Sequence, residues 1–70
     1  MLYNLERKRK DADFTQRELA EILGVTERQY QRLEAGTSDG SIKVWKQLSK
    51  LFDTTIDYLL EQEVTNSYLQ

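Results

Sequence analysis

The sequence contains no cysteine, no histidine and no proline, and each absence narrows what the chain can be. Without cysteine, neither a disulfide nor a thiolate metal site can stabilise the fold. Without histidine, both the commonest metal ligand and the commonest general acid or base are missing. The lack of proline and the presence of only three glycines favour helices with short connections. We therefore expect an all-α protein with no cofactor and no enzymatic activity.

Long hydrophobic runs are also absent, since the longest apolar stretches are pairs such as Ile22–Leu23 and Leu59–Leu60. Such pairs are far too short for a membrane span or the core of a signal peptide. Together with the lack of cysteine, this predicts a cytoplasmic protein without a membrane partner. Seventy residues suffice for one small domain. We place that domain at residues 1–63 and a C-terminal tail at residues 64–70.

The net charge of −2 argues weakly against a nucleic-acid partner, but the charges are unevenly distributed. Residues 7–10 are all basic, and residues 1–36 carry seven basic and seven acidic side chains. Residues 52–70 carry four acidic side chains and no basic one. Because the negative charge is concentrated near the C-terminus, another surface of the protein can still be positive.

Start and stop signals divide the chain into helices. Two capping boxes, Thr15–Glu18 and Thr26–Gln29, mark helix starts, because the threonine and the side chain three residues later satisfy each other's backbone amides. Gly24 and Gly36 mark helix ends, where a left-handed conformation is needed. Ser41 is a further candidate cap. The expected helices cover residues 4–12, 16–23, 27–35, 42–52 and 56–62.

Apolar residues recur at helical spacing and define an expected core. The inward-facing set is predicted to be Leu2, Leu5, Ala12, Leu19, Ala20, Ile22, Leu23, Tyr30, Leu33, Val44, Trp45, Leu48, Leu51, Phe52, Ile56, Leu59 and Leu60.

The most informative unit is the pair of helices at residues 16–23 and 27–35, which only three residues separate. Helices joined so tightly cross steeply, and the second can then project from the surface. Ala20 supplies a small residue four positions before Gly24, where the two helices must touch. Val25 follows Gly24, and its side chain is expected to fill the space inside the turn between the two helices.

The helix over residues 27–35 presents a polar face away from its apolar residues. Arg28, Gln31 and Arg32 lie on that face. Arginine can hydrogen-bond guanine with two donors, and glutamine can pair with adenine in the same way. Most charged helix faces are simply solvated, but the tight turn before this helix favours the reading of DNA bases.

The segment Phe14–Gly36, FTQRELAEILGVTERQYQRLEAG, resembles the helix-turn-helix of the Cro/repressor (XRE-type) family. The later LFDTTIDYLL resembles the junction between that family's fourth and fifth helices. With the first helix, the similarity covers about residues 4–61. The resemblance implies a compact, five-helix, lambda-repressor-like domain with the helix-turn-helix formed by its second and third helices. It also implies a homodimer that binds a two-fold symmetric operator in double-stranded DNA.

The resemblance further implies roles for individual residues. Gln16 and Lys43 match positions that contact DNA phosphates, and Arg9 and Glu34 match an ion pair that ties the first helix to the end of the third. Gln16 is expected to be exposed, and so are Arg28 and Arg32 of the helix over residues 27–35, which we call the reading helix. The full predicted DNA-binding set is Gln16, Arg17, Thr26, Glu27, Arg28, Gln29, Gln31, Arg32 and Lys43.

The chain departs from the family pattern at two places. Asp13 stands where the family usually has a glycine, and aspartate tolerates the left-handed conformation expected there. The loop over residues 37–40 carries Asp39 in place of the basic residues common in relatives, which predicts modest affinity for DNA.

Two function classes compete. A DNA-binding transcriptional regulator, and a repressor in particular, fits the arginines of the reading helix. A protein-interaction module, such as an antitoxin or the partner subunit of a regulatory pair, fits the acidic C-terminal third. Nothing in the sequence indicates a catalytic site or a small-molecule ligand. Candidate residues for a dimer contact are Leu59, Leu60, Val64, Tyr68 and Leu69.

Overall fold

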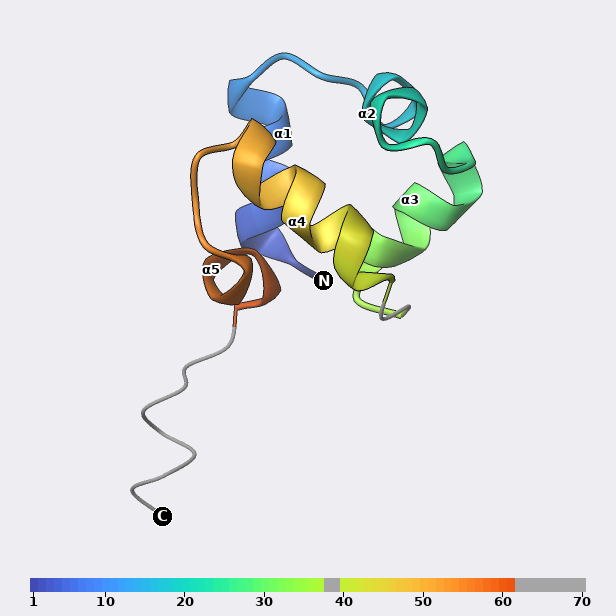
Figure 1. The fold of residues 1–70 in the computed structure, drawn as a ribbon. Helices are drawn as coiled ribbons and strands as arrows, with labels where there is room; N and C mark the ends of the chain where they lie inside the picture. The colour runs from blue at the N-terminus through green and yellow to red at the C-terminus, as the bar shows by residue number, and fades with distance from the viewer. Residues whose placement is uncertain (38–39, 62–70) are drawn as a thin grey trace, which may run out of the picture.

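A computed structural model describes residues 1–37 and 40–61, and this part of the chain is all-helical (Figure 1). Five helices follow one another without a strand in that part of the chain, which confirms the expected fold class. In Figure 1, α4 crosses the molecule between α3 and α5, so α3 and α5 lie on opposite sides. The helices are α1 (Tyr3–Asp11), α2 (Gln16–Leu23), α3 (Glu27–Ala35), α4 (Ile42–Leu51) and α5 (Ile56–Leu60).

Both predicted capping boxes are present. The hydroxyl of Thr15 accepts a hydrogen bond from the Glu18 amide at 3.0 Å, and the Glu18 carboxylate accepts one from the Thr15 amide at 2.9 Å. Thr26 and Gln29 make the same reciprocal pair at 3.1 and 2.9 Å. The side-chain oxygen of Ser41 likewise caps α4. These local bonds fix where three of the five helices begin.

Left-handed residues end several helices. Gly24 closes α2 with φ 74° and Gly36 closes α3 with φ 79°, as predicted. Asp13 adopts φ 62°, so aspartate does take the backbone conformation that the family usually assigns to glycine. α5 ends at Leu60, two residues before the predicted end at residue 62, and Glu61 is its left-handed cap with φ 58°.

The helix boundaries differ from the prediction by one residue elsewhere. α1 begins at Tyr3 and ends at Asp11, with Ala12 as its cap. α4 ends at Leu51, and Phe52 is its cap. Both ends fall at capping residues, which lie half inside a helix by nature.

Ten apolar side chains form one buried core, which α1, α2, α3, α4 and α5 all contribute to. Three predicted core residues are wrong: Ala12 is exposed at the end of α1, Ile22 is 49% exposed and Leu51 is 41% exposed. Ala12 lies just beyond the last residue of α1, and Ile22 and Leu51 lie at the edges of the apolar stripes of α2 and α4. The buried set is Leu5, Leu19, Ala20, Leu23, Tyr30, Leu33, Val44, Trp45, Leu48 and Leu59; Leu2, Val25, Phe52, Ile56 and Leu60 pack against it half-buried.

The turn between α2 and α3 has the predicted construction. Ala20 is completely buried where the two helices meet, and the Val25 amide donates to the Ala20 carbonyl at 3.0 Å. The Val25 side chain packs against the core. Tyr30 and Leu33 anchor α3, so its opposite face must point away from the protein.

In residues 1–37 and 40–61, no helix is long and apolar enough to cross a membrane.

Gly40 occupies a position that sequence reasoning did not single out. Its φ is +66°, and an added Cβ would lie 2.5 Å from Cδ2 of Leu33 and 3.1 Å from Nε1 of Trp45. Gly24 has a similar φ of +74°, but nothing lies within 4 Å of the place its Cβ would take. The two glycines therefore separate backbone strain from crowding.

We expect Gly24→Ala to lower the free energy of unfolding by about 1–2 kcal/mol, the cost of a left-handed alanine. Gly40→Ala should cost about 1–3 kcal/mol more, because the methyl group crowds two buried side chains. Urea denaturation of the two variants measures the difference. Equal losses would contradict the crowding at Gly40.

Candidate nucleic-acid interface

The outer face of α3 is exposed and polar. Arg28, Gln31 and Arg32 are all exposed, whereas the residues of α3 that face the other way are buried. Neither arginine forms an ion pair with any residue in 1–37 or 40–61. Their guanidinium groups are therefore available to an external partner.

The side chains at the start of α3 divide their roles. Thr26 and Gln29 use their oxygens in the capping box, and both are exposed. A glutamine whose Oε1 is held by the Thr26 amide can still donate from its amide nitrogen. Glu27 is exposed in the first turn, where the helix dipole favours a carboxylate.

An open depression of about 500 Å³ lies between the end of α1 and the start of α2. It brings together three of the predicted DNA-binding residues, Gln16, Arg17 and Glu27. Arg9 is paired with Glu34, so Lys10, Arg17 and the Gln16 amide are the groups here that could meet an anion such as a phosphate. It is lined by Arg9, Lys10, Asp13, Phe14, Thr15, Gln16, Arg17 and Glu27.

Two of these basic side chains have weak partners within their own helices. The Arg17 Nε lies 3.7 Å from the Glu21 carboxylate, and the Lys10 Nζ lies 3.6 Å from the Glu6 carboxylate. Exposed pairs of this kind contribute well under about 1 kcal/mol, so a phosphate can displace them at little cost.

Lys43 is exposed at the start of α4 and lies apart from that depression. It lines a second one, of about 350 Å³, with Ile42, Lys46, Gln47 and Lys50. The predicted set therefore falls into three groups: the outer face of α3, the start of α2 and the start of α4.

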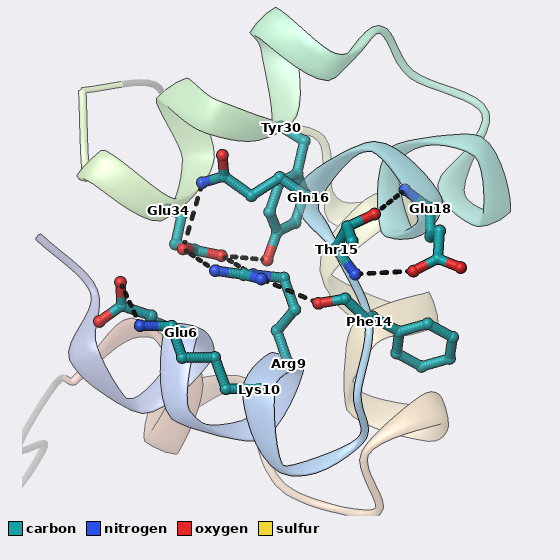
Figure 2. A network of polar contacts seen from close by, with 9 residues as sticks. All are labelled: Glu6, Arg9, Lys10, Phe14, Thr15, Gln16, Glu18, Tyr30 and Glu34. Atoms are coloured by element: carbon teal, nitrogen blue, oxygen red, sulfur yellow. Dashed lines mark hydrogen bonds and ion pairs between the residues drawn. The ribbon is translucent and has the colours of Figure 1, made fainter.

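Gln16 differs from its prediction. It is half-buried instead of exposed, and its Nε2 donates a hydrogen bond to Oε1 of Glu34 at 3.3 Å (Figure 2). Because an amide nitrogen carries two hydrogens, one remains for a phosphate. Its replacement will consequently affect folding as well as binding.

Glu34 is the centre of a buried polar network that joins α1, α2 and α3 (Figure 2). Its side chain is 1% exposed and forms the ion pair with Arg9 that the family resemblance implies, with Nε to Oε2 at 2.8 Å and Nη2 to Oε1 at 3.0 Å. The hydroxyl of Tyr30 donates to Oε2 at 2.6 Å. Nη1 of Arg9 reaches the Phe14 carbonyl at 2.8 Å, across the turn between α1 and α2.

These contacts decide the ionisation of the network. Burial pushes the pKa of Glu34 upward, but the hydrogen bonds from Arg9, Tyr30 and Gln16 together hold it below its usual value. The hydrogen bond to Glu34 raises the pKa of Arg9. Burial, helped by the hydrogen bond to Glu34, raises the pKa of Tyr30. The site therefore holds a charged pair and a neutral tyrosine.

The sequence analysis predicted the Arg9–Glu34 pair but not the hydrogen bonds that Tyr30 and Gln16 donate to Glu34. Tyr30 and Glu34 are four residues apart on one helix, a spacing at which side chains meet, so that contact had a local signal. The Gln16 contact joins residues 18 apart and had none.

The predicted dimer-contact residues can be compared with the structure only in part. Leu59 is completely buried in the chain's own core, so its predicted role in a dimer contact is wrong; Leu60 is half-buried there. Val64, Tyr68 and Leu69, with the whole predicted tail at 64–70, lie outside the described residues. Across residues 1–37 and 40–61, no cluster of three or more acidic side chains could hold a metal ion.

A tight α2–α3 turn, an exposed polar face on α3 and a capped α2 beside an open depression define a helix-turn-helix protein. The family model described as "Helix-turn-helix" matches residues 5–59, and the chain belongs to that family. A protein of Bacillus subtilis (strain 168), named "Uncharacterized HTH-type transcriptional regulator YqaE", is 33% identical over 67 residues. The match covers 96% of this chain but only 58% of that relative's length. No solved structure matches the chain significantly.

The network predicts how stability depends on Glu34. Glu34→Gln should lower the free energy of unfolding by about 3–5 kcal/mol at neutral pH, because Arg9 is left without its buried charged partner. Tyr30→Phe removes one hydrogen bond to the carboxylate and should cost about 1.5–3 kcal/mol. Urea denaturation measures both.

Acid should remove the stabilisation that the ionised Glu34 carboxylate gives to the folded protein. Because folding lowers the pKa of Glu34, its stabilisation is present above the unfolded pKa and is lost as the pH falls through the folded one. The unfolding free energy of the unmodified protein should therefore fall more steeply below about pH 5 than that of Glu34→Gln. Parallel pH profiles would show that Glu34 does not ionise differently in the two states.

Proposed function

We propose that the protein is a sequence-specific transcriptional regulator that binds double-stranded DNA, with α3 in the major groove of a two-fold symmetric operator. The observation that carries the proposal is the exposed face of α3, where Arg28, Gln31 and Arg32 point away from the core. An α-helix fits the major groove, and these side chains have the donors that base edges require. The helix-turn-helix family and the relative named as a transcriptional regulator support the same function.

Backbone contacts would come from the flanks of α3. The depression at the start of α2 offers Gln16, Arg17 and the first amides of that helix to one phosphate. Lys43 offers an ammonium group to another, at the start of α4. Thr26, Glu27 and Gln29 lie at the end of α3 that enters the groove, where they meet bases or nearby phosphates.

A repressor role, a cytoplasmic location and binding as a homodimer complete the proposal. Two-fold operators match two-fold protein dimers, because each half-site must meet the same surface. A small domain that covers a promoter can block transcription by occupancy alone. No catalytic activity and no small-molecule ligand are part of this function.

Base reading and backbone binding can be separated by mutation. Arg28→Ala and Arg32→Ala should each weaken binding by about 1–3 kcal/mol and relax the preference at one base pair of each half-site. Gln16→Ala should weaken binding to all sequences alike, because a phosphate carries no base information. The measurement is affinity across single-base variants of a site selected in vitro, at a temperature where each variant is folded. Equal losses on every sequence for both arginine variants would remove α3 as the reading helix.

Salt gives an independent measure of the backbone contacts. The logarithm of the binding constant should fall linearly with the logarithm of salt concentration, and Lys43→Gln should reduce the slope by about 0.9 for each lost contact, so about 1.8 for a dimer. Lys8→Gln, on the half-buried side of α1 above the Tyr58 ring, is the matched control and should leave the slope nearly unchanged. A slope that Lys43→Gln leaves intact would show that Lys43 does not touch DNA.

A further inference from the structure

Glu27 differs from the other glutamates of the first three helices. Those four each contact another group of the chain, which is a basic side chain in three cases and a backbone amide in the fourth; they are Glu6, Glu18, Glu21 and Glu34. Within residues 1–37 and 40–61, the Glu27 carboxylate forms no ion pair and no side-chain hydrogen bond. It is exposed in the first turn of α3, the helix that the proposed function places in the major groove.

Glu27 also lies beside the place proposed for a DNA phosphate. Its side chain lines the depression of about 500 Å³ together with Gln16 and Arg17. A carboxylate there adds repulsion to a site that otherwise attracts an anion. The helix dipole favours an acidic residue in this turn, but the benefit is small for an exposed side chain, and the capping box already fixes the start of α3. The structure of the helix therefore does not require this carboxylate.

The major groove offers a carboxylate few partners. Guanine presents N7 and O6 and thymine presents O4, all of which are acceptors, and the backbone presents negative phosphates. The only donors are the amino groups of cytosine and adenine. Adenine presents the acceptor N7 beside its amino group, so a carboxylate meets repulsion together with attraction there. Cytosine presents a donor and no acceptor, which makes it the base that fits Glu27.

We infer that Glu27 is a specificity-determining residue, whose carboxylate accepts a hydrogen bond from the N4 amino group of one cytosine in each half-site. Any other base at that position sets at least one acceptor against the carboxylate, which has then lost water without gaining an adequate donor. Glu27 consequently discriminates mainly by weakening the binding of wrong sequences. The inference rests on the proposed function and adds to it the identity of one base pair of the operator.

The place of Glu27 on α3 keeps it apart from the two arginines. At about 100° per residue, Glu27 lies about 100° from Arg28 and about 140° from Arg32 around the helix axis. Neither arginine forms an ion pair with it. The arginines can therefore bind guanines while Glu27 binds a cytosine on the side of α3 that faces the start of α2.

In vitro selection of DNA sites with the unmodified protein, Glu27→Gln and Glu27→Ala tests the inference. Glutamine has the same length but pairs with adenine through a donor and an acceptor, so the preferred base at one position should change from cytosine to adenine. Alanine has neither group, so the preference at that position should disappear. Preferences elsewhere in the site should remain, because Arg28 and Arg32 are unchanged.

Affinity measurements test the exclusion of wrong sequences. On the site selected with the unmodified protein, replacing the cytosine and its partner base should weaken binding of that protein by roughly 5–150-fold. The same replacement should have a far smaller effect on Glu27→Ala. Both variants should bind a duplex of random sequence more tightly than the unmodified protein does, because no carboxylate then faces the acceptors. Circular dichroism confirms that each variant is folded.

The matched control is Asp57→Asn. Asp57 is also exposed in the first turn of its helix, and its replacement removes one negative charge in the same way. It lies on α5, on the opposite side of α4 from α3 (Figure 1). At about 0.15 M salt, exposed charges are screened beyond about 8 Å, so the control should keep both the selected site and the affinity for random DNA.

The outcomes separate this inference from the proposed function. A cytosine preference that both Glu27 variants lose, with tighter binding to random DNA and an unchanged control, supports it. The same site selected by all three proteins, a base other than cytosine preferred by the unmodified protein at the altered position, or a control that gains as much affinity for random DNA as the variants, would each overturn the inference alone. If the unmodified protein selects no site at all, the proposed function and the inference are both wrong.

Discussion

The arrangement of the first three helices depends on one buried carboxylate. Glu34 accepts hydrogen bonds from Arg9 of α1, Gln16 of α2 and Tyr30 of its own helix. Apolar packing is non-directional, so a small core can hold helices together without fixing their angles. A bidentate guanidinium–carboxylate pair has a defined geometry, and it sets α1 against the end of α3. The start of α2 and the outer face of α3 are therefore placed relative to each other by the same group.

Features set by neighbours in sequence were predictable. The capping boxes at Thr15 and Thr26 and the left-handed ends at Gly24 and Gly36 all follow from residues within one helical turn, and all are confirmed. The exposed side of α3 followed as well, because Tyr30 and Leu33 fix which side is buried.

Features set by tertiary neighbours were not. Helical spacing identifies an apolar stripe but not its width, which depends on how far the next helix reaches. Ile22 and Leu51 lie beyond that reach and are exposed. Gln16 is bound to a carboxylate 18 residues away, and the space that a side chain at residue 40 would need is filled by Leu33 and Trp45, so neither had a local signal. The Arg9–Glu34 pair came from the family resemblance, not from the pattern of residues.

The net charge of −2 is a poor guide to the partners of this chain, because α4 carries only basic charges and the segment after it only acidic ones, while the first three helices carry both. Basic side chains are concentrated on the last turn of α1, the outer face of α3 and α4. The charged residues of the segment after α4, by contrast, are all acidic. A polyanion responds to the local field within about 8–10 Å, not to the sum over the molecule. A domain can therefore be acidic overall and still present a positive surface to DNA. The acidic segment over residues 52–61 lies on the side of α4 opposite α3, where its repulsion from phosphates at α3 is weakest.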